Sequence, residues 1–351
     1  MAALLLAGIL AAVLGFAAHR ASICTVRGVA EVMSSGTGHI LLGIGKAALW
    51  VSAITIPIFA LMPSASMGLG AWPLTGMAVL GGFVFGVGAA INGGCAFSTL
   101  ARLADGEGRM LAAGAAFGLG VLAFILLADW HVVERPVPLP ALVGSLLGWW
   151  PFVIAVVLVP WGLFEAARLW RTRPRGDRVH VLLLAPQYRV SSAAMLIGVA
   201  GAAIFLIHGS PSYTVTLQQV VEGWRGSGHF PAIERWLLLL AMLAGMLLST
   251  WQRGSFRLDW RPRPSWLRNL CGGFLMGLGV GLTPGGNDTL VLYGIPSLSP
   301  HALPASLAML AGIALGLWAM RAALGIELRV ACRNDLSTAA ETPPGKKPPM
   351  A

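Results

Sequence analysis

The chain has 351 residues, of which 56% are hydrophobic and 11% are charged, and its mean hydropathy is +0.76. Soluble domains carry about 25% charged residues, so this composition excludes an ordinary soluble protein. It predicts an all-α integral membrane protein, because the apolar runs are close to the roughly 20 residues that span a bilayer. The net charge of +10 comes from arginines in short loops without interleaved aromatic residues, so nucleic acid is not expected as a partner.

About nine transmembrane helices are predicted along the chain. They cover approximately residues 2–18, 40–62, 73–92, 109–129, 142–166, 190–208, 232–251, 267–283 and 302–323. Four connections could each hold a short helix in a polar dip, at 21–35, 95–104, 213–223 and 287–294. Irregular backbone near membrane depth is stable only where protein or water satisfies its polar groups. The dips are therefore the places where a transport site is expected.

One apolar, glycine-rich segment occurs twice. GGFVFGVGAAINGGC at Gly81–Cys95 returns as GGFLMGLGVGLTPGGN at Gly272–Asn287, at an offset of 191 residues until one extra residue enters near Pro284. Five spans separate equivalent helices, so these helices run in opposite directions. The pattern predicts an inverted-topology repeat, which many secondary transporters share, with the substrate site at the paired helix breaks.

The positive charges predict the orientation of the chain. All 24 Lys and Arg except Arg135, Arg225 and Arg235 lie on the side that holds the odd-to-even loops and the C-terminal tail. Cytoplasmic loops carry the excess of Lys and Arg, so the N-terminus is expected outside and the C-terminus in the cytoplasm.

Four parts are predicted: a first membrane repeat at 1–130, a linking helix with an Arg-rich cytoplasmic loop at 131–189, a second repeat at 190–323, and a disordered cytoplasmic tail at 324–351.

Two cysteines stand out as candidates to line a transport path. Cys95 follows the break Asn92-Gly93-Gly94, and Cys24 lies between Ser22 and Thr25 in the first dip. The glycines expose backbone N–H groups, and a helix that begins at Cys95 would present its N-terminus there, which favours an anion. A membrane cysteine can instead be a small buried filler, which is the interpretation for Cys271 and, at the interface, for Cys332. No CxxC pair is present, so no metal site or cofactor is predicted.

The dip of the second repeat carries an acid in place of a cysteine. Thr283 precedes the break, and Asn287, Asp288 and Thr289 follow it. An ionisable group at membrane depth is costly and suggests a functional role, whereas an aspartate in this place can also cap the short helix. The hypothesis is that Asn287 and Thr289 contact the substrate while Asp288 points away from it. The alternative is that Asp288 faces the path and a proton travels with the substrate.

The motifs Ser22–Gly28 (SICTVRG) and Asn92–Ala96 (NGGCA) resemble those of the YeeE/YedE family of sulfur-transport membrane proteins, over roughly residues 1–323. The resemblance implies an hourglass-shaped protein of the bacterial inner membrane that takes up thiosulfate or a related sulfur anion. It also implies cysteines in central dips that pass the substrate along by weak contacts, and often a small cytoplasmic TusA-like sulfur carrier as partner. Cys24 and Cys95 match two of these cysteines, and Gly286-Asn287-Asp288 stands where the third is expected.

The favoured function is therefore a transporter rather than an enzyme. A second hypothesis is a membrane-embedded thiol enzyme that passes sulfur or electrons through Cys24 and Cys95, although the chain has neither a CxxC pair nor a cofactor motif. A third is a scaffold subunit of a larger complex, which would require both cysteines to be dispensable.

Overall fold

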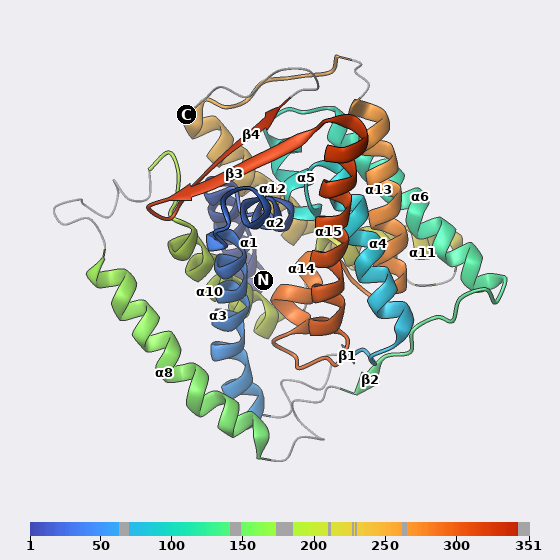
Figure 1. The fold of residues 1–351 in the computed structure, drawn as a ribbon. Helices are drawn as coiled ribbons and strands as arrows, with labels where there is room; N and C mark the ends of the chain where they lie inside the picture. Colours follow the sequence, from blue (N-terminus) through green and yellow to red (C-terminus); the bar gives the residue numbers. More distant parts are fainter. Residues whose placement is uncertain are drawn as a thin grey trace.

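Long helices form a bundle that encloses several short ones (Figure 1). The computed structural model describes residues 1–62, 70–140, 149–172, 185–209, 212–226, 228, 230–261 and 265–342. Within these residues, the predicted spans are the helices α1 (Ala2–Ala21), α3 (His39–Leu61), α4 (Gly76–Asn92), α6 (Arg109–Asp129), α8 (Trp150–Arg171), α10 (Val190–His208), α12 (Ile233–Arg253), α13 (Ser265–Leu282) and α15 (Ala302–Leu324). Eight of them are long and apolar enough to cross a membrane. The chain is an all-α integral membrane protein, as its composition predicts.

The helix outside that set of eight is α13, which the sequence predicts as a ninth span. It is 18 residues long, and Arg268 and Asn269 near its start lower its hydropathy. It packs against both α4 and α6. Half of its length, including Gly272, Gly273 and Gly277, is buried. Because protein covers much of its surface, this helix needs less apolar character than one that faces lipid.

Short helices occur in all four predicted dips. They are α2 (Thr25–Ser35), α5 (Ala96–Ala104), α11 (Tyr213–Arg225) and α14 (Asn287–Thr289), the last continued by the π-helix η2 (Leu290–Gly294). Residues with positive φ precede all four of them: Ser22 at 51°, Gly93 at 74°, Gly209 at 72° and Gly285 at 135°. This left-handed conformation ends a helix, as Gly93 ends α4. The sequence-based prediction of four short helices is confirmed.

Glycines bring the central helices unusually close together. A Cβ added at Gly82 of α4 would lie 2.3 Å from the carbonyl oxygen of Ala305 in α15. A Cβ at Gly273 of α13 would lie 2.2 Å from that of Ala113 in α6. Gly82 and Gly273 occupy equivalent positions of the repeated glycine segment, and the two alanines occupy equivalent positions of α6 and α15. The same backbone contact therefore occurs twice, and each time it joins a helix of one repeat to a helix of the other.

The helix contacts are unchanged when the two repeats are exchanged. The α4–α15 pair corresponds to α13–α6, and the α1–α12 pair corresponds to α10–α3. α4 and α13, which are equivalent, pack on each other with Gly81 beside Gly279 and Gly88 beside Gly272. Residue numbers rise along one helix as they fall along the other, so the two helices are antiparallel. This is the arrangement that an inverted-topology repeat requires.

A β-hairpin follows α15, where the sequence predicts a disordered tail from residue 324. The strands β3 (Glu327–Arg333) and β4 (Leu336–Thr342) pair antiparallel, so the prediction is wrong for this segment. Leu328, Val330 and Cys332 alternate with more exposed residues, and this period-two pattern places one side of β3 against α2. The Ser34 hydroxyl donates to the carbonyl of Val330, with 2.8 Å between the oxygens. Residues 343–351 lie outside the described residues.

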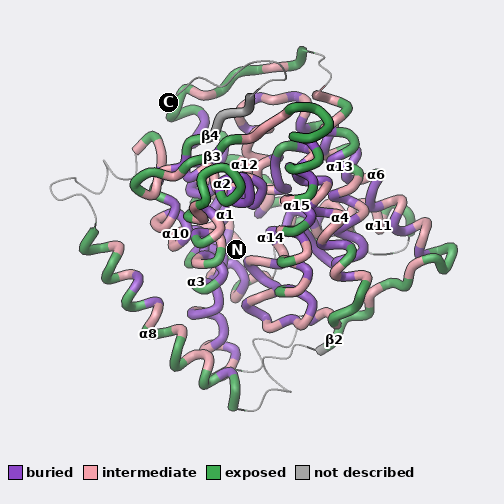
Figure 2. Tube along the Cα trace, viewed as in Figure 1, coloured by how far each residue is buried: buried purple, intermediate pink, exposed green. Residues whose placement is uncertain are grey.

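The predicted linking segment, 131–189, is described only in part. Residues 141–148 and 173–184, which include much of the Arg-rich loop, lie outside the described residues. β2 (Leu139–Pro140) pairs with β1 (Gly70–Ala71). α8 lies at the edge of the bundle against α3, and most of its surface is exposed (Figure 2). Lys46 of α3 pairs with the buried carboxylate of Glu165 in α8 over 2.9 Å, which fixes this helix to the first repeat.

Candidate functional site

Two cysteines of the first repeat meet in the interior, each directly before a short helix. Cys24 is the N-cap residue of α2 and Cys95 that of α5, and only 2% and 1% of these residues are exposed. The backbone N–H of Cys95 donates to the Sγ of Cys24 over 3.5 Å. A helix N-terminus carries unsatisfied N–H groups and a partial positive charge. Both thiols therefore lie where an anion is stabilised.

Tight turns place the cysteines at these helix starts. The N–H of Gly94 donates to the carbonyl of Ala89 over 3.0 Å, so the chain turns back immediately after α4. Gly93 supplies the positive φ of this turn. A Cβ at Gly94 would lie 2.7 Å from the Oγ of Ser98. The pair Gly93-Gly94 thus lets α5 begin at once beside the end of α4, with Cys95 between the two helices.

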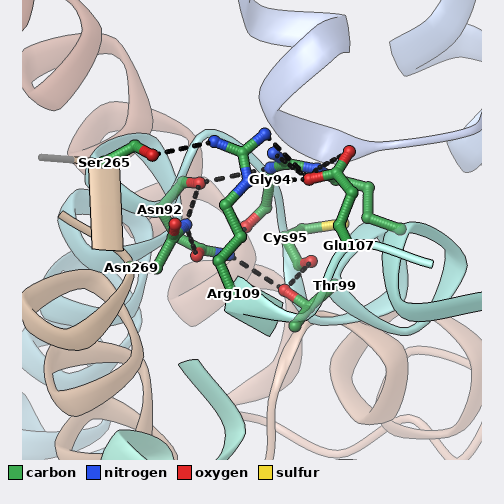
Figure 3. Close-up of polar contacts among 9 residues, drawn as sticks. Asn92, Gly94, Cys95, Thr99, Glu107, Arg109, Ser265 and Asn269 are labelled. Atoms are coloured by element: carbon green, nitrogen blue, oxygen red, sulfur yellow. Dashed lines mark hydrogen bonds and ion pairs between the residues drawn. The ribbon is translucent and has the colours of Figure 1, made fainter. Parts of the chain in front are cut away.

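A buried pair of asparagines holds the turn before Cys95 in place (Figure 3). The Nδ2 of Asn92 donates to the carbonyl of Gly94 at 3.0 Å and to the Oγ1 of Thr99 at 2.9 Å. The Nδ2 of Asn269, in α13, donates to the Oδ1 of Asn92 at 2.7 Å. Both asparagines are 2% exposed. Asn269 is a site residue that sequence reasoning missed, although an asparagine within an apolar span is itself a signal.

In the second repeat, Thr283 takes the place of Asn92 and also bonds to the facing helix. The position of Thr283 in the repeated segment is equivalent to that of Asn92, and its hydroxyl donates to the carbonyl of Ala78 over 3.0 Å. Ala78 lies in α4 and is equivalent to Asn269 in α13. The structure therefore places Thr283 in the packing between the repeats, and it is not among the residues that line the cavity of the cysteines.

A charged cluster fixes the far end of α5 (Figure 3). Arg102 donates to the Oε2 of Glu107 at 2.8 Å, and Arg109 donates to the same oxygen at 2.9 Å. A second nitrogen of Arg109 donates to the Oγ of Ser265 at 3.2 Å, at the start of α13. These contacts join α5, α6 and α13, so the orientation of the helix that begins at Cys95 is determined at both of its ends.

Asp288 lies in a ring of hydroxyl groups. Its carboxylate, in a residue that is 4% exposed, accepts hydrogen bonds from the hydroxyls of Ser212 and Thr214, each over 2.7 Å. Ser212 is the N-cap residue of α11, and its Oγ lies 2.6 Å from that of Thr289. The N-terminus of α11 thus already faces an anion, the protein's own carboxylate.

Asn287 joins the two repeats. Its Nδ2 donates to the Oγ1 of Thr25 over 3.4 Å, whereas its buried Oδ1 has no hydrogen-bond partner among the described residues. A cavity of about 50 Å³ lies between the repeats. Its polar lining consists of Cys24, Thr25, Cys95, Asn287 and Asp288. Apolar side chains from both repeats line the rest of it, including Ile44, Phe97 and Val291.

The structure therefore brings together five of the residues singled out in the sequence. The other six are in the surrounding turns and helix contacts and do not line this cavity: Ser22, Asn92, Gly93, Gly94, Thr283 and Thr289. Cys271 is exposed and Cys332 lies in β3. A cavity with two thiols, one amide and helix N-termini offers weak, polarisable hydrogen-bond donors.

A family profile described as sulphur transport matches residues 20–315, which include both cysteines and the second glycine-rich break. No curated protein matches the chain. The matched segment covers most of the chain and both repeats, in agreement with the resemblance of the two cysteine motifs. The chain therefore belongs to the YeeE/YedE family of sulphur transport.

Proposed function

We propose that this protein takes up thiosulfate, or a closely related small sulfur anion, across the bacterial inner membrane by a path through the cavity of Cys24 and Cys95. The observation that carries the proposal is the meeting of two thiols from one repeat with the amide of Asn287 from the other in a buried cavity. Discontinuous helices that meet between inverted repeats are the usual place of a transport site.

The helix starts give this cavity its preference for anions. The N–H groups at the starts of α2 and α5 are directed toward the two sulfur atoms, and Cys95 donates one of them to Cys24. In a medium of low dielectric constant these dipoles act more strongly than in water. Thiols are weak donors and polarisable acceptors. A sulfur anion can therefore exchange one weak thiol contact for the next as it moves, and no single strong binding site holds it back.

Asp288 is compatible with an anionic substrate because hydroxyl groups surround its carboxylate. At an effective dielectric constant near 20, two like charges about 4 Å apart repel by roughly 4 kcal/mol. Two hydroxyl donors at 2.7 Å hold the carboxylate on the side of α11, and this arrangement reduces its effect in the cavity. We infer that Asn287 supplies the outer polar contact of the path and Asp288 fixes the start of α11.

The orientation follows from the positive charges. We propose that the N-terminus lies outside and the C-terminus in the cytoplasm, so that the hairpin and the ends of α1 and α4 face the cytoplasm. A small TusA-like sulfur carrier is the proposed recipient of the substrate there. The concentration of arginines on that side would suit an acidic partner.

Uptake by reconstituted protein tests the proposal. Cys24→Ala and Cys95→Ala should each reduce uptake of labelled thiosulfate into proteoliposomes to near background, because the path would lose a polarisable contact. Cys271→Ala and Cys332→Ala are matched controls outside the cavity and should transport as the wild type does. Full uptake by the Cys95→Ala protein would reduce this residue to a packing role. A stable sulfur adduct on either thiol would favour the alternative, a thiol enzyme.

A further inference from the structure

A second cavity, of about 500 Å³, lies at the opposite ends of the central helices. Residues at the start of α12 and just before α15 line it, among them Arg235 and His301. The ends of α6 and α10 and the middle of α11 complete the wall. Cys95 follows the end of α4 at Asn92, whereas this cavity lies near the beginning of α4, beside Trp72. The proposed path to the thiols does not by itself explain so large a polar space.

Four polar side-chain atoms around this cavity are buried and have no hydrogen-bond partner among the described residues. They are Nη1 of Arg235, Nε2 of His208, Nε2 of His301 and Oε1 of Gln219. His301 is only 1% exposed, and its Nδ1 lies 2.9 Å from the Oγ of Ser299. A buried polar group that is left unsatisfied destabilises the fold, and a charged group does so more strongly. Together they give one cavity several polar groups that a small ligand can satisfy.

The chemistry of these groups favours an oxyanion. A guanidinium group presents donors in a planar fork that matches an oxyanion. Burial lowers the pKa of His301 to about 4, so at neutral pH its ring is uncharged and can offer an N–H group without adding charge. The carboxylates of this region have other contacts: Glu222 accepts from Gln218 at 2.8 Å, Asp129 pairs with Arg135, and Glu234 lies 3.9 Å from the Nδ1 of His208. The charge of Arg235 is thus available to a ligand.

The position of this cavity relates it to the proposed path. Thr289 and Tyr293 line it, while Asn287 and Asp288, two residues and one residue before Thr289, line the cavity of the cysteines. The hydroxyl of Ser212 contacts both linings, because it lies 2.6 Å from the Oγ1 of Thr289 and donates to the carboxylate of Asp288 at 2.7 Å. One turn of the α14 and η2 segment therefore separates the larger cavity from the thiols.

We propose that Arg235, with His301 and His208, forms a thiol-independent binding site for a tetrahedral sulfur oxyanion, which the anion occupies before it reaches the cysteines. The inference rests on the proposed function for its place in the path, but the binding itself does not require transport. Such a site concentrates the substrate by charge, and the thiols then act on an anion that is already desolvated.

Anion binding to the purified full-length protein tests this site. Sodium thiosulfate and sodium sulfate are titrated calorimetrically at constant ionic strength, set with chloride. Arg235→Gln should weaken the binding of both anions by about tenfold or more, since a charged hydrogen bond is lost. Arg235→Lys should retain part of the affinity. Arg225→Gln is the matched control. Like Arg235, Arg225 is one of the three basic residues predicted on the outer side, but it does not line the cavity.

Further measurements distinguish the loss of the anion site from a folding defect. Thiosulfate should raise the unfolding temperature of the wild type and of Arg225→Gln, but not that of Arg235→Gln. His301→Gln, which removes an uncharged group, should also weaken both anions. In proteoliposomes, Arg235→Gln should raise the KM for uptake while the maximal rate stays near that of the wild type.

The outcomes separate the two proposals. Unchanged affinity of Arg235→Gln and His301→Gln for both anions would overturn the site, even if Cys95→Ala abolishes uptake. Conversely, Arg235-dependent binding with full uptake by the cysteine variants would retain the site and overturn the path through the thiols.

Discussion

Residues at the starts of short helices distinguish the two repeats. In the first repeat Cys24 and Cys95 precede α2 and α5 and leave the N–H groups of these helices to a ligand. In the second, Ser212 precedes α11 and Asp288 occupies the place near its N-terminus. The helix N-termini of the first repeat are thus left to a bound anion, whereas the N-terminus of α11 in the second repeat faces the carboxylate of Asp288.

Replacement of Asp288 tests this assignment. Asp288→Asn should lower the unfolding temperature in detergent, because hydrogen bonds to a charged group contribute about 1.5–3 kcal/mol. The pH profile of thiosulfate uptake should stay as in the wild type. Asp335→Asn is a suitable control, since Asp335 accepts from the N–H of Ser191 at the start of α10, away from the path. If the acid dependence of uptake disappears in Asp288→Asn, this carboxylate carries a proton with the substrate.

A partly buried carboxylate, that of Asp105, predicts an acid sensitivity of the fold. Burial would raise the pKa of Asp105, but contacts with His19, Ser255 and Thr250 hold it below its ordinary value of 3.8. A lowered pKa in the folded state means that Asp105 stabilises the protein above about pH 4 and that this contribution is lost as the pH falls further. The unfolding temperature of Asp105→Asn should therefore fall less than that of the wild type between about pH 6 and pH 3. An equal fall would contradict this role, and Asp129→Asn serves as an exposed control.

At the scale of elements, glycines determine how closely the central helices pack. Gly120 in α6 faces the carbonyl of Phe274 in α13, where an added Cβ would lie 2.0 Å away. Its counterpart Gly312 in α15 faces the carbonyl of Phe83 in α4 at 2.1 Å. Contacts this close between backbones are typical of membrane helices, which associate mainly by van der Waals packing.

Alanine substitutions within one helix test the role of these contacts. Gly120→Ala should destabilise the protein by about 1–3 kcal/mol, because α6 and α13 must separate to admit the methyl group. Gly114→Ala is the matched control in the same helix, since nothing lies within 4 Å of its added Cβ, and it should be neutral or stabilising. Gly312→Ala should behave as Gly120→Ala does. Equal unfolding temperatures for the Gly114→Ala and Gly120→Ala proteins would contradict the close contact.

At the scale of the whole molecule, the antiparallel pair α4 and α13 relates the repeats as an inverted pair. One polar dip from each repeat then reaches the interior from opposite faces, and Thr25 meets Asn287 there. The larger cavity is lined by Arg135, in the connection after α6, and by Arg235, near the start of α12; they are two of the three Lys and Arg residues predicted on the outer side.

Reporter fusions test the orientation of this arrangement. Fusions after residue 180 and at the C-terminus should report the cytoplasm, and a fusion near residue 226 should report the outside, since positive loops stay in the cytoplasm. The C-terminal fusion is the reference for the other two. An outside signal at residue 180 would contradict both the proposed orientation and the assignment of the larger cavity to the outer face.

The sequence by itself determined the membrane class, the helical segments, the repeat and the two cysteine motifs. These features depend on hydropathy and on glycine spacing along one helix, which are local properties of the chain. Only the tertiary structure decided that Cys24 and Cys95, 71 residues apart, share a cavity with Asn287, and that Asn269 holds the turn before Cys95. The hydroxyl partners of Asp288 and the hairpin on α2 also depended on it. Contacts between distant segments depend on how helices pack, and short polar strands gain their stability from the surface that they cover.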